Sequence, residues 1–255
     1  MLKMTNKLHK LLVTGRIFTV EEAAHFLDLG AKDTAKALSR YVEQNIVVRI
    51  KRGFYLPVHS RFSTGDEAFS NPWIVLPKIF PEHYIGGWSA AHHFGFTDQL
   101  FSSTCVLTTA RIMRPKVHLK KFTYALFRSQ SLNCTEILWV DQEKIPISNP
   151  HKTILDMFHN PKCGAGITHV IECFRCYLTE AFNLELFKEA AEPYQNRALF
   201  KRIGYISELL LGIDHPICTL AKARLTKGHS LLEFDSPSPT LIDRWNLFIP
   251  TGFSL

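Results

Sequence analysis

Apolar positions near the N-terminus recur with a helical period and then give way to short β-rich runs. A first amphipathic helix is predicted over residues 4–14. A second helix is predicted to begin after Thr19, because Glu22 stands three residues later and the two residues form the pattern of a capping box. Gly30 is expected to end this helix, since glycine is common just beyond a helix C-terminus.

A third helix and a β-hairpin are predicted next. The helix runs from about Asp33 to Gln44 and places Ala35, Leu38 and Val42 on one apolar face. The runs IVVRI and GFYLP follow, and Lys51-Arg52-Gly53 connects them. The order helix, turn, helix, hairpin is that of a winged helix-turn-helix, in which the second helix of the pair enters the major groove. We assign this module to residues 1–58.

The rest of the chain is predicted to form a larger, separate domain. Residues 59–82 are rich in turn-forming residues and are expected to be a linker. Residues 83–255 contain strand and helix patterns in mixed order, including a helix with Asn149 as N-cap and Pro150 at its first position. The predicted fold class is therefore α+β, with an N-terminal winged helix-turn-helix followed by a larger mixed α/β domain.

Positive charge is concentrated in the first module. The chain has 255 residues and a net charge of +7. Residues 1–60 hold ten Lys and Arg against five Asp and Glu, whereas residues 61–255 hold twenty against eighteen. A small module that carries most of the excess charge points to nucleic acid or another acidic surface as its partner.

The basic residues of this module coincide with the elements that would meet DNA. Lys32, Lys36 and Arg40 recur every four residues, away from the apolar face, and Thr34 is short enough to approach a base edge. A basic turn in the wing would contact the DNA backbone. The predicted DNA-binding residues are Lys32, Thr34, Lys36, Arg40, Arg49, Lys51 and Arg52. A solvated charged face is the competing interpretation.

A second basic segment lies between residues 111 and 121 and contains no acid. It is either a second phosphate contact or a solvated loop or hairpin, and the second interpretation is the commoner one for such charge runs. Its basic residues are Arg111, Arg114, Lys116, Lys120 and Lys121.

No catalytic or cofactor site is predicted. Cys173 and Cys176 form a CxxC pair near His169, but zinc needs four ligands and a second pair is missing. Phosphate-binding loops, dinucleotide fingerprints and nucleophile elbows are absent from the sequence. We therefore predict no metal, no cofactor and no enzymatic activity. The six scattered cysteines fit reduced thiols, and neither a signal peptide nor a membrane span is predicted, so a cytoplasmic location is expected.

Five segments in a fixed order resemble the AbiEi antitoxin family of bacterial type IV toxin–antitoxin systems, and the likeness extends over nearly the whole chain. The double glycine of GGW is a departure from the family pattern, in which one glycine or a serine is more usual. The segments are RIKRGFYLP (49–57), YIGGWSAAHHFGFTDQ (84–99), ISNPHKTILDMF (147–158), FKRIGYISELL (200–210) and DRWNLFIP (243–250).

This resemblance implies a specific role. Such proteins bind inverted repeats in their own promoter through the winged helix and repress the operon. Their C-terminal domain helps to counter a nucleotidyltransferase-like toxin, and the two proteins need not form a stable complex. Carried onto this chain, the DNA contacts would come from the helical and wing residues named above, and no catalytic set is implied.

Two other functions stay open at this point. One is a ligand-responsive transcription factor whose C-terminal domain senses a small molecule and which has no toxin partner. The other is a DNA-targeted, metal-dependent nuclease, which would need a clustered acidic or metal site. Oligomeric state is also open, although palindromic sites usually imply a two-fold arrangement of the protein.

Overall fold

The computed structural model of the chain describes residues 11–13, 16–58, 71–80, 82–119, 122–140, 143–195, 197–233 and 239–255. Of the first predicted helix, residues 11–13 are helical and the rest lies outside the described residues. The chain forms two compact units. One holds residues 1–80 with 117–123 and 139–144, and the other holds 81–116, 124–138 and 145–255. The predicted domain limits of 58 and 83 stay a prediction.

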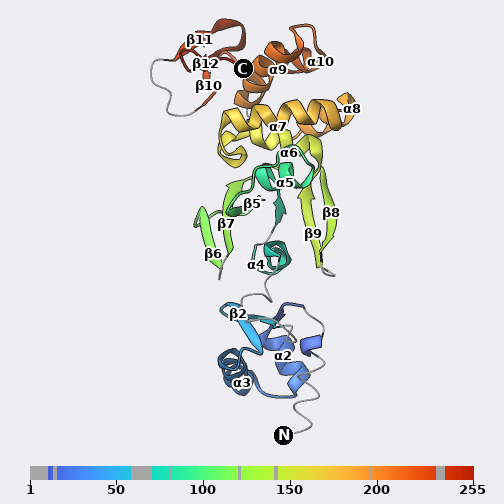
Figure 1. Cartoon of the computed structure of the whole chain (residues 1–255), viewed down its shortest axis with the longest axis vertical. Helices are drawn as coiled ribbons and strands as arrows, with labels where there is room; N and C mark the ends of the chain where they lie inside the picture. The colour runs from blue at the N-terminus through green and yellow to red at the C-terminus, as the bar shows by residue number, and fades with distance from the viewer. Residues whose placement is uncertain are drawn as a thin grey trace. The chain divides into compact units, whose positions relative to one another are not determined.

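The N-terminal module has the predicted order of elements (Figure 1). It also has a short strand that the sequence pattern did not reveal, β1, which pairs with β3 and makes the wing a three-stranded sheet of order β1-β3-β2. The elements are β1 (Phe18–Thr19), α2 (Val20–Leu27), α3 (Ala31–Glu43), β2 (Val47–Lys51) and β3 (Phe54–Pro57).

The caps of the two helices confirm one prediction and correct another. Thr19 Oγ1 accepts from the Glu22 amide at 3.1 Å, and Glu22 Oε2 accepts from the Thr19 amide at 2.6 Å, so the capping box is present. The helix ends at Leu27, before Gly30, because Asp28 takes the left-handed conformation with φ of 56°. Aspartate tolerates that region better than most residues. Gly30 is instead the N-cap of α3.

The buried face of α3 is shifted by one residue from the predicted apolar face. Thr34, Ala37 and Leu38 are the buried residues of α3, whereas Ala35 and Val42 are half-buried. Leu38 packs in a cluster whose other buried members are Leu11, Phe18, Ala23, Val47 and Tyr55. The buried face of α3 therefore includes Thr34, which is one of the predicted DNA contacts.

Two short helices occupy part of the stretch predicted as a linker. The 3-10 helix η1 (Pro72–Val75) continues into α4 (Leu76–Ile79), and Asn71 caps the first of them by accepting from the Trp73 amide at 2.9 Å. Residues 59–70 lie outside the part of the chain that the structure describes.

A six-stranded sheet of order β6-β7-β5-β4-β9-β8 forms the base of the second unit, apart from the outer ends of its two hairpins, which belong to the first unit. Strand β4 pairs antiparallel with β5 and parallel with β9. The strands are β4 (His83–Ile85), β5 (Ser103–Thr108), β6 (Lys116–Leu119), β7 (Phe122–Arg128), β8 (Thr135–Val140) and β9 (Glu143–Ser148).

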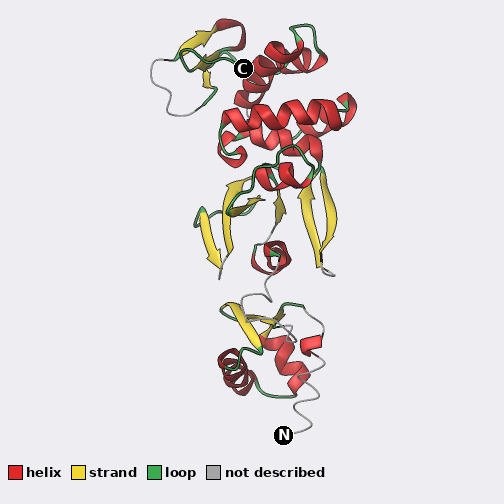
Figure 2. Ribbon diagram, in the orientation of Figure 1, coloured by secondary structure: helices red, strands yellow, loops and turns green. Residues whose placement is uncertain are grey.

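Helix α6 is the centre of the helical layer, because it contacts α5, α7, α8 and α9 (Figure 2). Its predicted caps are confirmed: Asn149 Oδ1 accepts from the Lys152 amide at 2.8 Å, and Pro150 is the first helical residue. The helices are α5 (Gly87–His93), α6 (Pro150–His159), η2 (Pro161–Gly164), α7 (Ile167–Glu180), α8 (Leu184–Ala191), α9 (Arg197–Leu211) and α10 (Pro216–Lys222).

The double glycine after β4 has a clear structural reason. Gly87 has φ of 52°, and a Cβ there would lie 2.1 Å from the Cys163 carbonyl oxygen. Since that atom belongs to backbone, no side-chain adjustment relieves the clash. Gly87 thus permits the close approach of α5 and η2.

A small C-terminal sheet of order β10-β12-β11 completes the second unit, with strands β10 (Ser230–Leu231), β11 (Thr240–Ile242) and β12 (Leu247–Ile249). The 3-10 helix η3 (Asp243–Trp245) packs on α9, where the Trp245 ring takes the place that a side chain at Gly204 would fill. The α+β fold class is confirmed. Within the described ranges, none of the helices is both long and apolar enough to cross a membrane.

Candidate nucleic-acid interface

The outer face of α3 presents three basic side chains to solvent. Lys32, Lys36 and Arg40 are all exposed, whereas Leu38 on the inner face is completely buried. One turn of helix separates each from the next, so the three charges follow the helix axis. A helix with one packed face and one basic face is suited to lie along a duplex groove.

Lys36 forms only a weak, exposed ion pair with Asp33. Its ammonium lies 4.0 Å from Asp33 Oδ1, and both side chains are about two-thirds exposed, at 65% and 69%. Such exposed pairs contribute little to stability because water screens the attraction. A phosphate can therefore replace Asp33 as the partner of Lys36 at small cost.

The wing carries the other three predicted residues. Arg49 is exposed in β2, and Arg52 is exposed in the two-residue turn that joins Lys51 to Phe54. Gly53 has φ of 86°, a conformation that this tight turn needs and that glycine adopts without strain. The Lys51 ammonium lies 4.4 Å from the centre of the Phe54 ring, and partial burial lowers the pKa of Lys51.

Thr34 does not belong to this surface, and its prediction as a DNA contact is corrected. Its side chain is completely buried, and its hydroxyl has no hydrogen-bond partner among the described residues. The sequence pattern misplaced it because a short residue near basic ones is expected to be exposed, whereas the apolar stripe of α3 passes through position 34.

The basic residues of the second basic segment that the structure describes are exposed. Arg111 and Arg114 lie in the connection before β6, and Lys116 is the first residue of that strand. All three are exposed. Lys120 and Lys121 lie outside the described residues.

A buried polar network in the second unit was not predicted. Lys152 and Asp156 face each other across one turn of α6 at 3.6 Å, with side chains only 3% and 2% exposed. Tyr84 and Tyr194 donate to the two oxygens of Asp156 at 2.8 and 2.5 Å. Burial and the Asp156 charge raise the pKa of both tyrosines well above its usual range. The spacing of Lys152 and Asp156 on a predicted helix was the available signal.

The side chains of this network are not accessible to a substrate. Lys152 also donates to Tyr194 at 3.3 Å and lies over the Tyr84 ring, and Tyr84 shares a 2.7 Å hydrogen bond with Ser129. Each polar group thus has a partner inside the protein, and its side chains are almost inaccessible to solvent. The arrangement stabilises the packing of α6 on its neighbours and leaves no acceptor for a substrate.

The CxxC segment shows no metal-site geometry. His169 is engaged by the Gly164 carbonyl at 2.7 Å and the Thr97 hydroxyl at 2.9 Å. Cys173 is buried, which raises the pKa of its thiol to about 12, whereas Cys176 is exposed. Throughout the described ranges, His, Cys, Asp and Glu do not gather in groups of three or more that could hold a metal ion.

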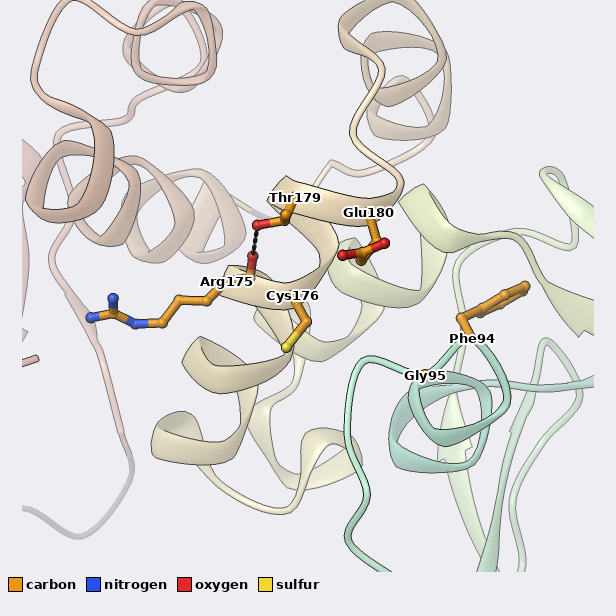
Figure 3. Close-up of a pocket in the computed structure, with 6 residues that line it drawn as sticks. All are labelled: Phe94, Gly95, Arg175, Cys176, Thr179 and Glu180. Carbon is orange, nitrogen blue, oxygen red and sulfur yellow. Dashed lines mark hydrogen bonds between the residues drawn. The ribbon is translucent and has the colours of Figure 1, made fainter.

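A surface pocket of about 540 Å³ lies beside α7 (Figure 3). Arg175 points away from Phe94 in this view, and the Thr179 hydroxyl is used within the helix, donating to the Arg175 carbonyl at 3.3 Å. The lining residues are Phe94, Gly95, Arg175, Cys176, Thr179 and Glu180. Its size is in the range of small-molecule sites, but the polar groups do not converge on one point.

Comparison with known proteins connects the first module to a family. Residues 9–58 match the family described as "Transcriptional regulator, AbiEi antitoxin". The fold is similar to the crystal structure of the RV2827C protein from Mycobacterium tuberculosis, with a TM-score of 0.60, 14% sequence identity and coverage of 92% of this chain and 86% of that one. No curated protein matches the chain. The likeness to the AbiEi antitoxin family of transcriptional regulators therefore extends over residues 9–58, the N-terminal module.

Proposed function

We propose that this protein is a DNA-binding repressor that controls its own operon and acts as the antitoxin to a nucleotidyltransferase-like toxin. Its target is double-stranded DNA, the inverted repeats of its own promoter. It works in the cytoplasm, without enzymatic activity of its own, and without forming a stable complex with the toxin.

One observation carries the DNA-binding part of the proposal. Lys32, Lys36 and Arg40 form an exposed basic row on the helix that follows the turn, opposite the buried Leu38. This is the helix that enters the major groove in proteins of this plan. The family match covers the same residues, which supports a regulatory role for this module.

The proposed docking follows from the placement of these charges. α3 lies in the major groove, with Lys32, Lys36 and Arg40 on phosphates at the groove edge. Arg49 and Arg52 of the wing contact the backbone of flanking DNA, and Lys51 adds charge from its position beside Phe54. Contacts of this kind position the protein, and they make its affinity fall steeply with salt.

A gel-shift titration against the upstream region of the gene tests the repressor role. The expected result is binding that survives an excess of unrelated competitor DNA and weakens as salt rises. Arg40→Ala and Arg52→Ala should weaken binding while the fold is retained. Binding no tighter than to the competitor would contradict sequence-specific repression.

Co-expression tests the antitoxin role. The proposal predicts a nucleotidyltransferase-like gene next to this one. That gene, induced alone, is expected to arrest growth, and this chain is expected to restore it. Because no stable complex is proposed, the two proteins should not co-purify. If growth is restored and the two proteins do co-purify, the toxin is neutralised by direct binding, and the proposed mechanism is wrong.

The pocket beside α7 favours a second candidate, a ligand-responsive transcription factor. Its volume of about 540 Å³ would admit a small metabolite. In that case a ligand would change DNA affinity, and Cys176→Trp, which fills the pocket, would abolish the change. DNA binding that is indifferent to cell extract metabolites and to this substitution would remove the candidate.

A further inference from the structure

The six-stranded sheet ends on one side in a long edge strand. β8 is the last strand of the order β6-β7-β5-β4-β9-β8, and among the described residues no further strand lies beyond it. A strand at the edge of a sheet leaves a row of backbone N–H and C=O groups that can pair with another chain. β8 can therefore offer main-chain hydrogen bonds to a partner.

Two large apolar side chains of β8 are exposed. Ile137 is 56% exposed and Trp139 is 63% exposed. Side chains two residues apart in a strand point to the same side of the sheet, so these two are neighbours on one face. The Lys144 ammonium lies 5.1 Å from the centre of the Trp139 ring and still leaves most of the ring in water. Adjacent exposed apolar side chains of this size are typical of an interaction surface.

The opposite edge of the same sheet has protection that β8 lacks. β6 is four residues long, follows Pro115 and begins with the exposed Lys116. Short length, proline and lysine are features by which proteins prevent a sheet edge from pairing with another chain. β8 has six residues and contains neither proline nor a basic residue. One edge is thus protected and the other is not, which favours β8 as the edge that pairs.

The sequence of β8 is complementary to itself in an antiparallel register centred on Leu138. When two copies pair about a two-fold axis at this residue, Ile137 of each copy lies opposite Trp139 of the other. An aromatic ring opposite a β-branched side chain is a favourable cross-strand pair. Glu136, the only charged residue of β8, then lies opposite Val140, so the two carboxylates do not face each other.

We propose that β8 is a dimerisation edge, on which a second copy of this chain places its own β8 antiparallel about a two-fold axis at Leu138. The two six-stranded sheets then form one continuous sheet. The choice of a second copy rests on the proposed function, because inverted repeats are usually bound by two copies related by a two-fold axis. Six residues from each copy make a small interface, so the dissociation constant is expected to be on the order of micromolar.

Sedimentation velocity of the full-length protein without DNA tests the dimer, at concentrations from about 1 to 200 µM. The natural chain is expected to change from monomer to dimer over this range. Ile137→Lys places a charge opposite Trp139 on both sides of the axis and should weaken dimerisation by at least about tenfold. The matched control is Leu186→Lys, which puts the same charge on a leucine of α8 that is 48% exposed, and it should dimerise like the natural chain.

Three results of this measurement would overturn the proposal. The first is a natural chain that stays monomeric at every concentration. The second is an Ile137→Lys variant that dimerises like the natural chain, and the third is an equal loss of dimer in the Leu186→Lys control. Circular dichroism of each variant shows that it has folded.

The absence of DNA separates this test from that of the proposed function. A chain that stays monomeric and binds its promoter specifically would leave the proposed function standing and remove the dimer. A dimer that depends on β8, in a chain without specific DNA binding, would leave the dimer standing and remove the repressor.

A cross-link tests the register without a disruptive substitution. Residues directly opposite in an antiparallel pair have Cα atoms about 4.5–5.5 Å apart, which is within the range of a disulfide. Leu138→Cys, combined with Cys176→Ser to remove an exposed natural thiol, is expected to give a disulfide-linked dimer with oxidised glutathione. Trp139→Cys in the same background should not, because residue 139 is not opposite itself in this register. Cross-linking of Cys176→Ser alone, or equal cross-linking through positions 138 and 139, would contradict the two-fold axis at Leu138, and so would a Leu138→Cys chain that does not cross-link.

Discussion

The two units of this protein use charged residues in opposite ways. In the N-terminal module, Lys32, Lys36 and Arg40 stand exposed on one helix face with little to bind inside the protein. In the second unit, Lys152 and Asp156 are buried and satisfied by each other and by two tyrosines. Exposed charges with weak partners are available to another molecule, whereas buried and satisfied ones are not.

The difference shows how to separate binding from stability in a chain with no catalytic signature. A basic residue on α3 should matter to DNA affinity and little to folding. A charged residue on α6 should matter to folding and not directly to DNA. The expected effects below test this division, beginning with the largest.

Asp156→Ala is expected to lower the free energy of unfolding by about 3–5 kcal/mol, because it leaves the Lys152 ammonium buried without its carboxylate. Urea denaturation measures this. The matched control is Glu185→Ala, which breaks an exposed pair with Lys188 at 2.9 Å and should cost less than about 1 kcal/mol. Equal losses in the two variants would contradict the assigned role of burial.

Arg40→Ala combined with Arg52→Ala is expected to reduce the slope of DNA affinity against salt by about two, one for each lost phosphate contact. Affinity for specific and unrelated DNA should fall by similar factors. The free energy of unfolding should stay within about 0.5 kcal/mol of the natural value, since both side chains are exposed. An unchanged slope would remove α3 and the wing as the docking face.

Thr19→Ala is expected to destabilise the N-terminal module by about 1 kcal/mol, because it removes the side-chain acceptor for the Glu22 amide. Thermal unfolding followed by circular dichroism checks the loss. Thr19→Ser keeps the hydroxyl and serves as the control, so a drop of the same size in Thr19→Ser would assign the effect to the lost methyl group.

Thr34→Val is expected to raise the stability by up to about 1 kcal/mol, because valine fills the same volume without a buried hydroxyl that lacks a partner. DNA affinity should not change, since the side chain is buried. Reduced affinity in a stably folded Thr34→Val variant would restore Thr34 to the set of DNA contacts.

Much of the N-terminal module was predictable from local pattern. The capping box of Thr19 and Glu22 and the hairpin around Gly53 depend on neighbours within a few residues, so the sequence reveals them. Strand β1 was missed because two residues have no measurable period, and only their pairing with β3 makes them a strand. The burial of Thr34 was missed for a related reason, since the inner face of α3 is chosen by what packs against it.

The second unit shows the same limit on a larger scale. The start of α6 was predicted from Asn149 and Pro150, yet the partners of Asp156 come from residues 84 and 194, far away in the chain. The sequence also marked the GGW segment as unusual, but its reason is the Cys163 carbonyl beside Gly87. Neither contact leaves a periodic trace, because it joins segments whose separation follows no rule.

By itself, the amino-acid sequence determined the α+β class, the order of helices and hairpin in the first module, the capping box of α2 and the uneven distribution of positive charge. The structural properties among these depend on backbone conformation within a few residues, and the charge distribution is a count of residue types along the chain. The tertiary structure alone decided which face of α3 is buried, that Lys152 and Asp156 close on two tyrosines, and that a basic stretch lies at a sheet edge. Burial and pairing of distant groups are properties of the packed chain, so they become readable only when the elements are in place.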